Sequence, residues 1–170
     1  IDVRTVFSFT KKKMAEALAV LQKVPGIEGC VLISTCNRME LWASTDDGFP
    51  EEGLYEQLCK IKEADPGMYR PYFVFRKERE AVQHLFWLAG GLKSRILGED
   101  QIVTQVGEAL SFAREQYATD SVMETLFRMA VTAAKKVKTE VELSHTDNSV
   151  VRTAIDTLKE QGQTFVGKKC

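Results

Sequence analysis

The chain of 170 residues is long enough for one ordinary domain, or for one domain and the start of another. With 44% hydrophobic and 28% charged residues, it can bury a core and stay soluble. Its 23 basic and 24 acidic side chains leave a net charge of −1, which argues against strong sequence-independent nucleic-acid binding, because basic side chains on phosphates supply that affinity. Two lysine clusters, at 11–13 and 135–138, are expected to be solvated helix faces rather than RNA contacts.

The sequence shows no sign of a membrane or secretory segment. No apolar run approaches the about 18 residues that a membrane-spanning helix needs, and the first ten residues lack the pattern of a secretion signal. The cysteines, Cys30, Cys36, Cys59 and Cys170, are irregularly spaced and form neither a C-x-x-C pair nor a dense disulfide framework. We therefore expect free thiols in a reducing cytoplasm.

The first 76 residues alternate between helix and strand patterns. Thr10 is a suitable N-cap for a helix over 11–24, and Pro25-Gly26 ends that helix. Apolar or alternating runs bounded by turn residues predict strands, and a second helical period follows the first two of them. The expected elements are strands at 29–34, 39–44 and 72–75 and a helix at 54–64. This alternation predicts an α+β or α/β layer.

After residue 76 the sequence predicts helices alone. The expected ranges are 77–92, which stops at Gly90-Gly91, then 99–117, 121–143 and 150–162. The first two of these helices each have an apolar stripe at helical spacing. The stripes are Ala81, Leu85, Leu88 and Leu92 in the first helix, and Ile102, Val106, Ala109 and Ala113 in the second.

Between the first two expected strands stands the stretch "STCNR", which places Cys36 beside Thr35, Asn37 and Arg38. A thiol is mostly protonated at neutral pH, and a neighbouring cation can convert it into a nucleophilic thiolate. If the backbone is extended here, Cys36 and Arg38 point to one face. Thr35 and Asn37 add a hydroxyl and an amide that can hold a substrate carbonyl. The alternative is a hairpin turn that happens to contain a cysteine, since a lone cysteine is more often a small buried hydrophobe.

His84 and two glutamines are the other candidates for chemistry. His84 lies on a helix beside the apolar stripe, so it is either a half-buried structural histidine, the more frequent case, or an acid–base group. Glu99 and Asp100 precede a helix, where capping accounts for them. Gln101 and Gln105 share a helix face next to the apolar stripe, which capping does not explain. The sequence has no phosphate-binding loop and no metal-ligand spacing.

Two long motifs together indicate a family. The stretch "STCNRMELW", followed later in the chain by "HLFWLAGGLKSRILGEDQIVTQV", closely resembles the catalytic domain of glutamyl-tRNA reductase. The resemblance covers essentially the whole chain, with Asp100 in place of a usual proline and Met39 in place of a common threonine. The family's first strand, with its G-x-x-H-x-x-A-like stretch, is absent, so we expect either a sheet that lacks a strand or a protein that begins earlier. The chain stops at Cys170, where the family's NADPH-binding domain would begin its first strand.

The resemblance implies an activity and a set of site residues. The family reduces the glutamate esterified to tRNA(Glu) to glutamate-1-semialdehyde with NADPH, the first step of C5-pathway tetrapyrrole (heme and chlorophyll) biosynthesis. By resemblance, Cys36 is the nucleophile that forms a thioester, and His84 is important for activity. The remaining substrate-binding positions implied are Thr35, Asn37, Arg38, Ser94, Glu99, Asp100, Gln101 and Gln105.

The resemblance also implies a fold and a domain order. We expect an α+β fold with a small mixed or antiparallel sheet and flanking helices, of the ferredoxin-like βαββαβ type, followed by a helical segment that leads to an absent Rossmann domain. The catalytic, glutamyl-tRNA-binding domain is expected over 1–145, with its α/β part about 1–76 and its helical part about 77–145. Residues 146–170 are expected to be a linker helix and the start of the NADPH-binding domain.

The implied cofactor and partners lie largely outside this chain. NADPH is expected to bind to the domain after Cys170, and no metal is expected. The partners implied are glutamyl-tRNA(Glu), a second copy of the full-length protein that binds through C-terminal helices, and glutamate-1-semialdehyde aminomutase as a candidate downstream enzyme. Two other classes remain open, a non-catalytic RNA-binding module and a structural or partner-binding domain with an inert Cys36. The rate at which Cys36 is alkylated discriminates between them and the enzyme.

Overall fold

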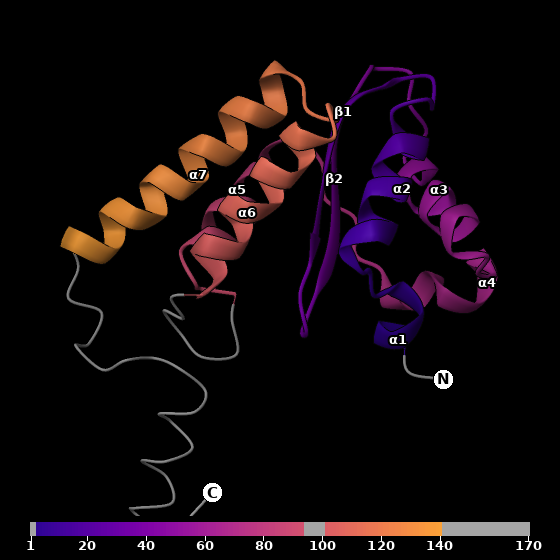
Figure 1. Ribbon diagram of the computed structural model, residues 1–170, viewed down its shortest axis with the longest axis horizontal. Helices are drawn as coiled ribbons and strands as arrows, with labels where there is room; N and C mark the ends of the chain where they lie inside the picture. Colours follow the sequence, from indigo (N-terminus) through magenta and orange to yellow (C-terminus); the bar gives the residue numbers. More distant parts are fainter. Residues whose placement is uncertain (1–2, 94–100, 141–170) are drawn as a thin grey trace, which may run out of the picture.

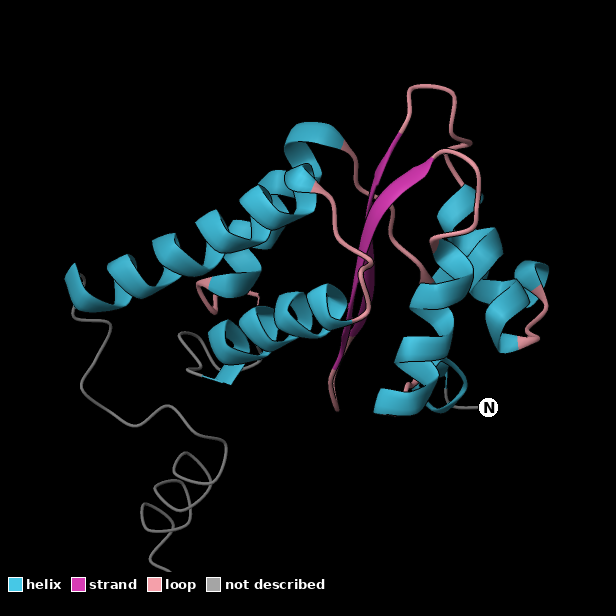
Figure 2. Cartoon of the chain, turned by 45° about the horizontal axis from the view of Figure 1, so that its top comes forward, coloured by secondary structure: helices cyan, strands magenta, loops and turns pink. Residues whose placement is uncertain are grey.

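An antiparallel hairpin stands between two layers of helices in the computed structural model (Figure 1), which describes residues 3–93 and 101–140. The hairpin consists of β1 (Ile27–Ser34) and β2 (Met39–Thr45). One layer contains the helices before and directly after the hairpin, and the other contains the last three described helices, as Figure 2 also shows. The first layer is α1 (Val3–Phe7), α2 (Lys11–Leu21), α3 (Gly53–Lys62), α4 (Pro66–Tyr69) and η1 (Arg70–Tyr72). The second is α5 (Glu78–Ala89), α6 (Gln101–Glu115) and α7 (Ser121–Glu140).

Helix α2 begins where the sequence predicts but ends at Leu21, three residues before the expected end at residue 24. Thr10 has an extended backbone, and its hydroxyl oxygen accepts a hydrogen bond from the backbone N–H of Lys13 at 3.3 Å, so it is the N-cap. After the helix the chain turns at Gly26, whose φ of +87° is a backbone conformation that favours glycine. Helix α2 therefore runs antiparallel to β1, and its N-terminus lies at the same end of the hairpin as the loop between the strands (Figure 1).

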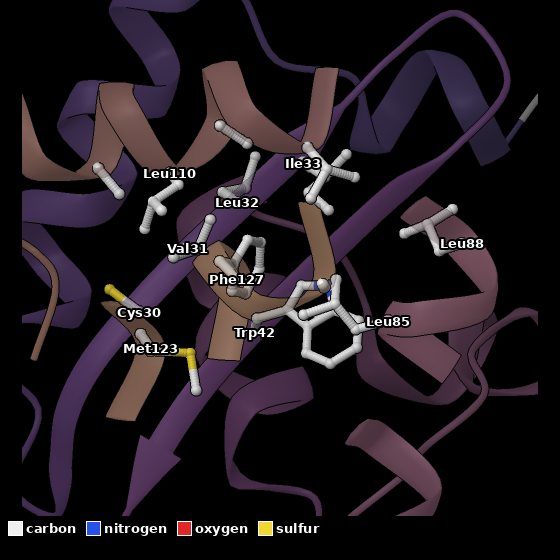
Figure 3. Close-up of a cluster of buried hydrophobic side chains, with 14 of the residues drawn as sticks. Cys30, Val31, Leu32, Ile33, Trp42, Leu85, Leu88, Leu110, Met123 and Phe127 are labelled. Atoms are coloured by element: carbon white, nitrogen blue, oxygen red, sulfur yellow. The ribbon is translucent and has the colours of Figure 1, made fainter. Parts of the chain in front are cut away.

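The core forms mainly on the side of the hairpin that faces α5, α6 and α7. Residues 30–33 of β1 are all buried, because helices cover both faces of this strand. Phe127 of α7 is fully buried and meets the ring of Trp42 edge-on, with 5.7 Å between centroids (Figure 3). Leu85 and Leu88 of α5 are also fully buried in this cluster. The stripe expected on α6 is confirmed, since Ile102, Val106, Ala109 and Ala113 are all buried.

Two sequence expectations are wrong in this region. Leu92, the last member of the stripe expected over 77–92, lies after the end of α5 and is 50% exposed. The strand expected at 72–75 is not formed: Phe73 has an extended backbone, but no neighbouring strand pairs with this segment. Phe73 instead packs edge-on against Phe7, and Phe75 packs against Tyr55. The alternation of aromatic residues thus reflects burial on α1 and α3 rather than membership of a sheet.

The α+β class is confirmed, whereas the ferredoxin-like type is not. The described residues form a two-stranded sheet, and the order α2-β1-β2-α3 matches only the middle of a βαββαβ arrangement. The helix expected at 150–162 lies outside the described residues. Within the described ranges, no helix is both long and apolar enough to cross a membrane.

A candidate active site at the tip of the hairpin

The loop between the strands is a tight turn of four residues, Thr35–Arg38. Ser34 pairs with Met39, and the N–H of Thr35 donates to the carbonyl of Arg38 at 2.8 Å. The hydroxyl oxygen of Thr35 accepts from the backbone N–H of Asn37 at 3.3 Å and of Arg38 at 3.1 Å. Such a turn is the local structure that a threonine hydroxyl favours. Of the two possibilities that the sequence left open, an extended backbone and a hairpin turn, the structure has the turn, because the Thr35 side chain closes the chain.

This turn exposes Cys36 and Asn37 and holds Arg38 partly buried beneath them. The Arg38 guanidinium donates through Nη1 to Glu40 Oε1 and through Nη2 to the carbonyl of Lys93, each at 2.7 Å. The first of these hydrogen bonds stays within the hairpin, and the second connects the hairpin to Lys93, which follows α5. The thiol thus lies on a turn whose neighbouring cation is fixed at two points.

Glu40 is the centre of a polar cluster on the face of the hairpin that packs against α5. Besides Arg38, its carboxylate accepts a hydrogen bond from Trp42 Nε1 at 3.1 Å, and His84 Nε2 lies 3.1 and 3.2 Å from its two oxygens. The His84 and Trp42 rings stack, with 5.9 Å between centroids and 15° between planes. We call these four residues, Arg38, Glu40, Trp42 and His84, the Glu40 cluster.

The environment of Glu40 keeps it ionised. Burial alone would raise its pKa, but the hydrogen bond and charge of His84, followed by those of Arg38, outweigh burial and hold the pKa below the ordinary value of 4.5. A carboxylate next to His84 Nε2 favours a proton on that nitrogen. His84 Nδ1, on the other side of the ring, is buried with no hydrogen-bond partner among the described residues. A buried, unpartnered nitrogen costs free energy.

The three described cysteines differ sharply in exposure. Cys36 is exposed, whereas Cys30 and Cys59 are 0% and 1% exposed. Burial, with a smaller effect from the Asp120 carboxylate, raises the pKa of the Cys30 thiol to about 12. Among these three thiols, Cys36 alone is accessible for chemistry with a large substrate.

The other predicted site residues are only partly placed by the structure. Gln101, the first residue of α6, is exposed, and Gln105 one turn later is half-buried. Ser94, Glu99 and Asp100 lie outside the described residues. No group of three or more His, Cys, Asp and Glu side chains in the described ranges is placed to hold a metal ion.

Sequence reasoning missed Glu40 and Trp42 as members of the site. Both stand within the motif that contains Cys36, but their pattern is that of an alternating strand. One signal was available: Glu40 lies opposite Ile33 of a buried strand, where an unpaired carboxylate would be costly. A carboxylate at such a position requires a cationic or hydrogen-bonding partner.

Fold and site together define an α+β domain that presents an exposed thiol on a hairpin turn beside a partly buried arginine–glutamate–histidine cluster. A family model described as "Glutamyl-tRNAGlu reductase, N-terminal domain" matches residues 1–141. The chain therefore belongs to the family of glutamyl-tRNA reductase N-terminal domains.

Individual relatives agree with this assignment. The chain is 45% identical over 165 residues to a glutamyl-tRNA reductase of Acetivibrio thermocellus, covering 95% of this chain and 48% of the relative. It is 38% identical over 162 residues to a probable multifunctional siroheme biosynthesis protein of Ruminiclostridium josui, covering 95% of this chain and 31% of the relative. The solved glutamyl-tRNA reductase from Methanopyrus kandleri shares the fold, with a TM-score of 0.68 at 24% identity over 92% of this chain and 35% of that one. This chain thus spans about half or less of the relatives' length.

Proposed function

We propose that this chain is the part of a glutamyl-tRNA reductase that takes the glutamyl group from glutamyl-tRNA(Glu) as a thioester on Cys36. One observation carries the proposal: within a chain of this family, Cys36 is the exposed thiol among the three described cysteines, on a turn whose neighbouring guanidinium is fixed by Glu40 and Lys93. The proposed activity places the full-length protein at the first step of tetrapyrrole biosynthesis.

The proposed chemistry is acyl transfer to sulfur. The Cys36 thiolate attacks the carbonyl carbon of the glutamyl ester, a C–S bond forms, and the bond to the ribose oxygen breaks. The ribose oxygen leaves with a proton, and the glutamyl group remains as a thioester. An exposed turn suits this step, because the ester is attached to the end of a large RNA that cannot enter a deep pocket.

Arg38 is proposed to bind a carboxylate of the substrate glutamate. A guanidinium has five N–H donors, and contacts with the described residues Glu40 and Lys93 use two of them, which leaves up to three for a ligand. The two fixed contacts hold the planar group in one orientation, which favours a bidentate contact. Thr35, whose hydroxyl shapes the turn, and Asn37, whose side chain is exposed, are proposed to border the same pocket.

His84 is proposed to act mainly by positioning Glu40. Its Nε2 is on the Glu40 carboxylate and its Nδ1 is buried, so neither nitrogen is directed at solvent near Cys36. This supports a role in which His84 orders Glu40 and Glu40 orders Arg38, in place of the direct acid–base role suggested by the sequence alone. Ser94, Glu99, Asp100, Gln101 and Gln105 remain proposed substrate-binding residues.

Hydride transfer belongs to the rest of the full-length protein. NADPH, when bound, supplies the hydride that reduces the acyl group. The described part of this chain does not fit NADPH itself, because none of its strands leads through a glycine-rich turn into a helix, the arrangement that binds a dinucleotide.

We propose a catalytic domain over 1–145 and a linker with the start of an NADPH-binding domain over 146–170. A cytoplasmic homodimer that passes its product to an aminomutase completes the proposal.

The test is carried out on the full-length protein with glutamyl-tRNA(Glu) and NADPH. Cys36→Ser should form no semialdehyde, because a serine hydroxyl without an activating base is a far weaker nucleophile. Cys59→Ala, which removes a buried thiol of α3, is the matched control and should remain active. Full activity of Cys36→Ser would refute the proposal.

A further inference from the structure

A cleft lies between α2 and α3, on the side of the hairpin away from α5, α6 and α7. Its volume is about 390 Å³. Apolar side chains, those of Phe9, Val20 and Ile61, form part of its lining, and Val20 is 48% exposed. The lining also contains three lysines, Lys13 from α2 and Lys60 and Lys62 from α3.

The charge of this cleft is mainly positive. Lys13 pairs with Glu16 at 3.0 Å, but both side chains are about half or more exposed, and such a surface pair contributes little and exchanges easily. Lys60 is exposed and has no ion-pair partner among the described residues. Burial, followed by repulsion from Lys13, lowers the pKa of Lys62. An anion in the cleft would relieve that repulsion.

Lys62 also makes a cation–π contact with Phe9. Its ammonium group lies 3.7 Å from the centroid of the Phe9 ring and donates a hydrogen bond to the carbonyl of Ser8. The segment 8–10 is therefore fixed against α3. The same segment continues into α2, whose first residues, Lys11 and Lys12, are exposed and add two more cations.

A hydrogen bond connects Phe9, in the lining of the cleft, to the strand that leads to the candidate active site. The N–H of Phe9 donates to the hydroxyl oxygen of Ser34 at 3.3 Å, and Ser34 is the last residue of β1 before the Thr35–Arg38 turn. Figure 1 shows the start of α2 and the tip of the hairpin at the same end of the molecule. A chain-like anion bound in the cleft would therefore extend towards Cys36.

We propose that the α2–α3 cleft binds the sugar–phosphate backbone of the single-stranded RNA end whose terminal ester reacts at Cys36. The proposal rests on the proposed function and adds a docking surface to it. Single-stranded RNA is bound by cationic grooves that follow its phosphates and by aromatic rings on which its bases stack. This cleft offers the cationic groove, with Lys13, Lys60 and Lys62 in its lining and Lys62 held in place over the Phe9 ring. The other lysine cluster, on α7, lies in the opposite helical layer (Figure 2).

The experiment compares two double variants of this chain that each lose two positive charges. The test variant is Lys13→Gln/Lys60→Gln, which leaves the packed Lys62 in place. The control is Lys135→Gln/Lys136→Gln on α7. The probe is a short single-stranded RNA with the 3′-terminal sequence of tRNA, and its Kd is measured at several salt concentrations. Circular dichroism verifies that both variants fold.

If two phosphate contacts are lost, the slope of log K against log salt falls by about 1.4, which corresponds to about 25-fold weaker binding at 0.1 M salt. The control should bind like the wild type. Equal binding by test variant and wild type, or equal loss in test and control, would overturn the proposal and leave the cleft a solvated surface. Cys36→Ser should bind the RNA normally. Failure of the thioester proposal would therefore be seen in activity, and failure of the docking proposal in RNA binding.

Discussion

Replacing Glu40 by glutamine is the sharpest structural test of the Glu40 cluster, because it removes one charge and changes almost no volume. In the structure one carboxylate oxygen accepts from Arg38 at 2.7 Å, the other accepts from Trp42 at 3.1 Å, and His84 Nε2 is within 3.2 Å of both. A glutamine amide has one acceptor oxygen, so its NH₂ group must face at least one of these donors. The side chain of Glu40 is only 18% exposed, and water cannot fully replace the lost acceptor.

The expected cost follows from these contacts. A hydrogen bond to a charged group contributes about 1.5–3 kcal/mol, and breaking a buried ion pair costs about 3–5 kcal/mol. Because Arg38 keeps 21% of its side chain exposed, we expect the lower part of this range, a loss of about 2–4 kcal/mol in the free energy of unfolding. Urea denaturation at pH 7 measures it. Glu28→Gln, at an exposed position of β1, is the matched control and should change stability by less than about 0.5 kcal/mol.

The pH dependence gives this prediction a second, independent readout. The pKa of Glu40 is lower in the folded protein than its ordinary value of 4.5, so the unfolded chain binds this proton more tightly. The stabilisation by Glu40 is therefore fully present above pH 4.5 and is lost as the pH falls through the folded-state pKa. The difference between wild type and Glu40→Gln should shrink on acidification. If wild type and Glu40→Gln have the same free energy of unfolding at pH 7, or a difference that does not change with pH, the Glu40 carboxylate does not stabilise the fold in this way.

Three further predictions address the thiols, the core and the arginine. Iodoacetamide should label Cys36 in the folded chain, whereas Cys30 and Cys59 should react only in denaturant; rapid labelling of either in the native state would contradict their burial. Phe127→Ala should lower the free energy of unfolding by about 3–5 kcal/mol in a urea titration, since the ring is fully buried against Trp42, and a loss below about 1 kcal/mol would show that the core collapses around the site. Arg38→Lys in the full-length protein should reduce semialdehyde formation by an order of magnitude or more although the charge is kept; near-normal activity would show that Arg38 acts only as a nearby positive charge.

The elements that follow from local chemistry were predictable from the sequence. The Thr10 cap defines the start of α2 without any tertiary information, and the structure places it there, whereas the helix ends at Leu21, before the Pro25-Gly26 stop. The strands on either side of Cys36 are also close to their expected ranges. The segment 72–75 was not predictable in this way, because an alternating aromatic run is equally compatible with a strand and with an extended chain packed on helices, and only the tertiary contacts decide between them.

The candidate site likewise combines features that the local sequence predicts with features that depend on tertiary contacts. The motif around Cys36 indicated the thiol and left a hairpin turn open as one alternative. Glu40 and His84, however, are 44 residues apart in the chain, and they meet only because α5, packed on α6 and α7, brings His84 next to β2. A sequence pattern records which side chains are present and not which of them pair across layers. The engagement of Arg38 by Glu40 and by the carbonyl of Lys93 likewise depends on how the segment after α5 returns to the hairpin.

The most direct test of a glutamyl thioester on Cys36 is mass spectrometry of this chain after brief incubation with glutamyl-tRNA(Glu) and acid quenching. The wild-type chain should gain the mass of one glutamyl group, located by peptide mapping on Cys36 and released by hydroxylamine as a thioester should be. Cys36→Ala should show no such adduct, whereas Cys59→Ala should show it. No adduct on the wild-type chain, with free glutamate released no faster than from glutamyl-tRNA alone, would contradict the central claim, as would an adduct that persists in Cys36→Ala.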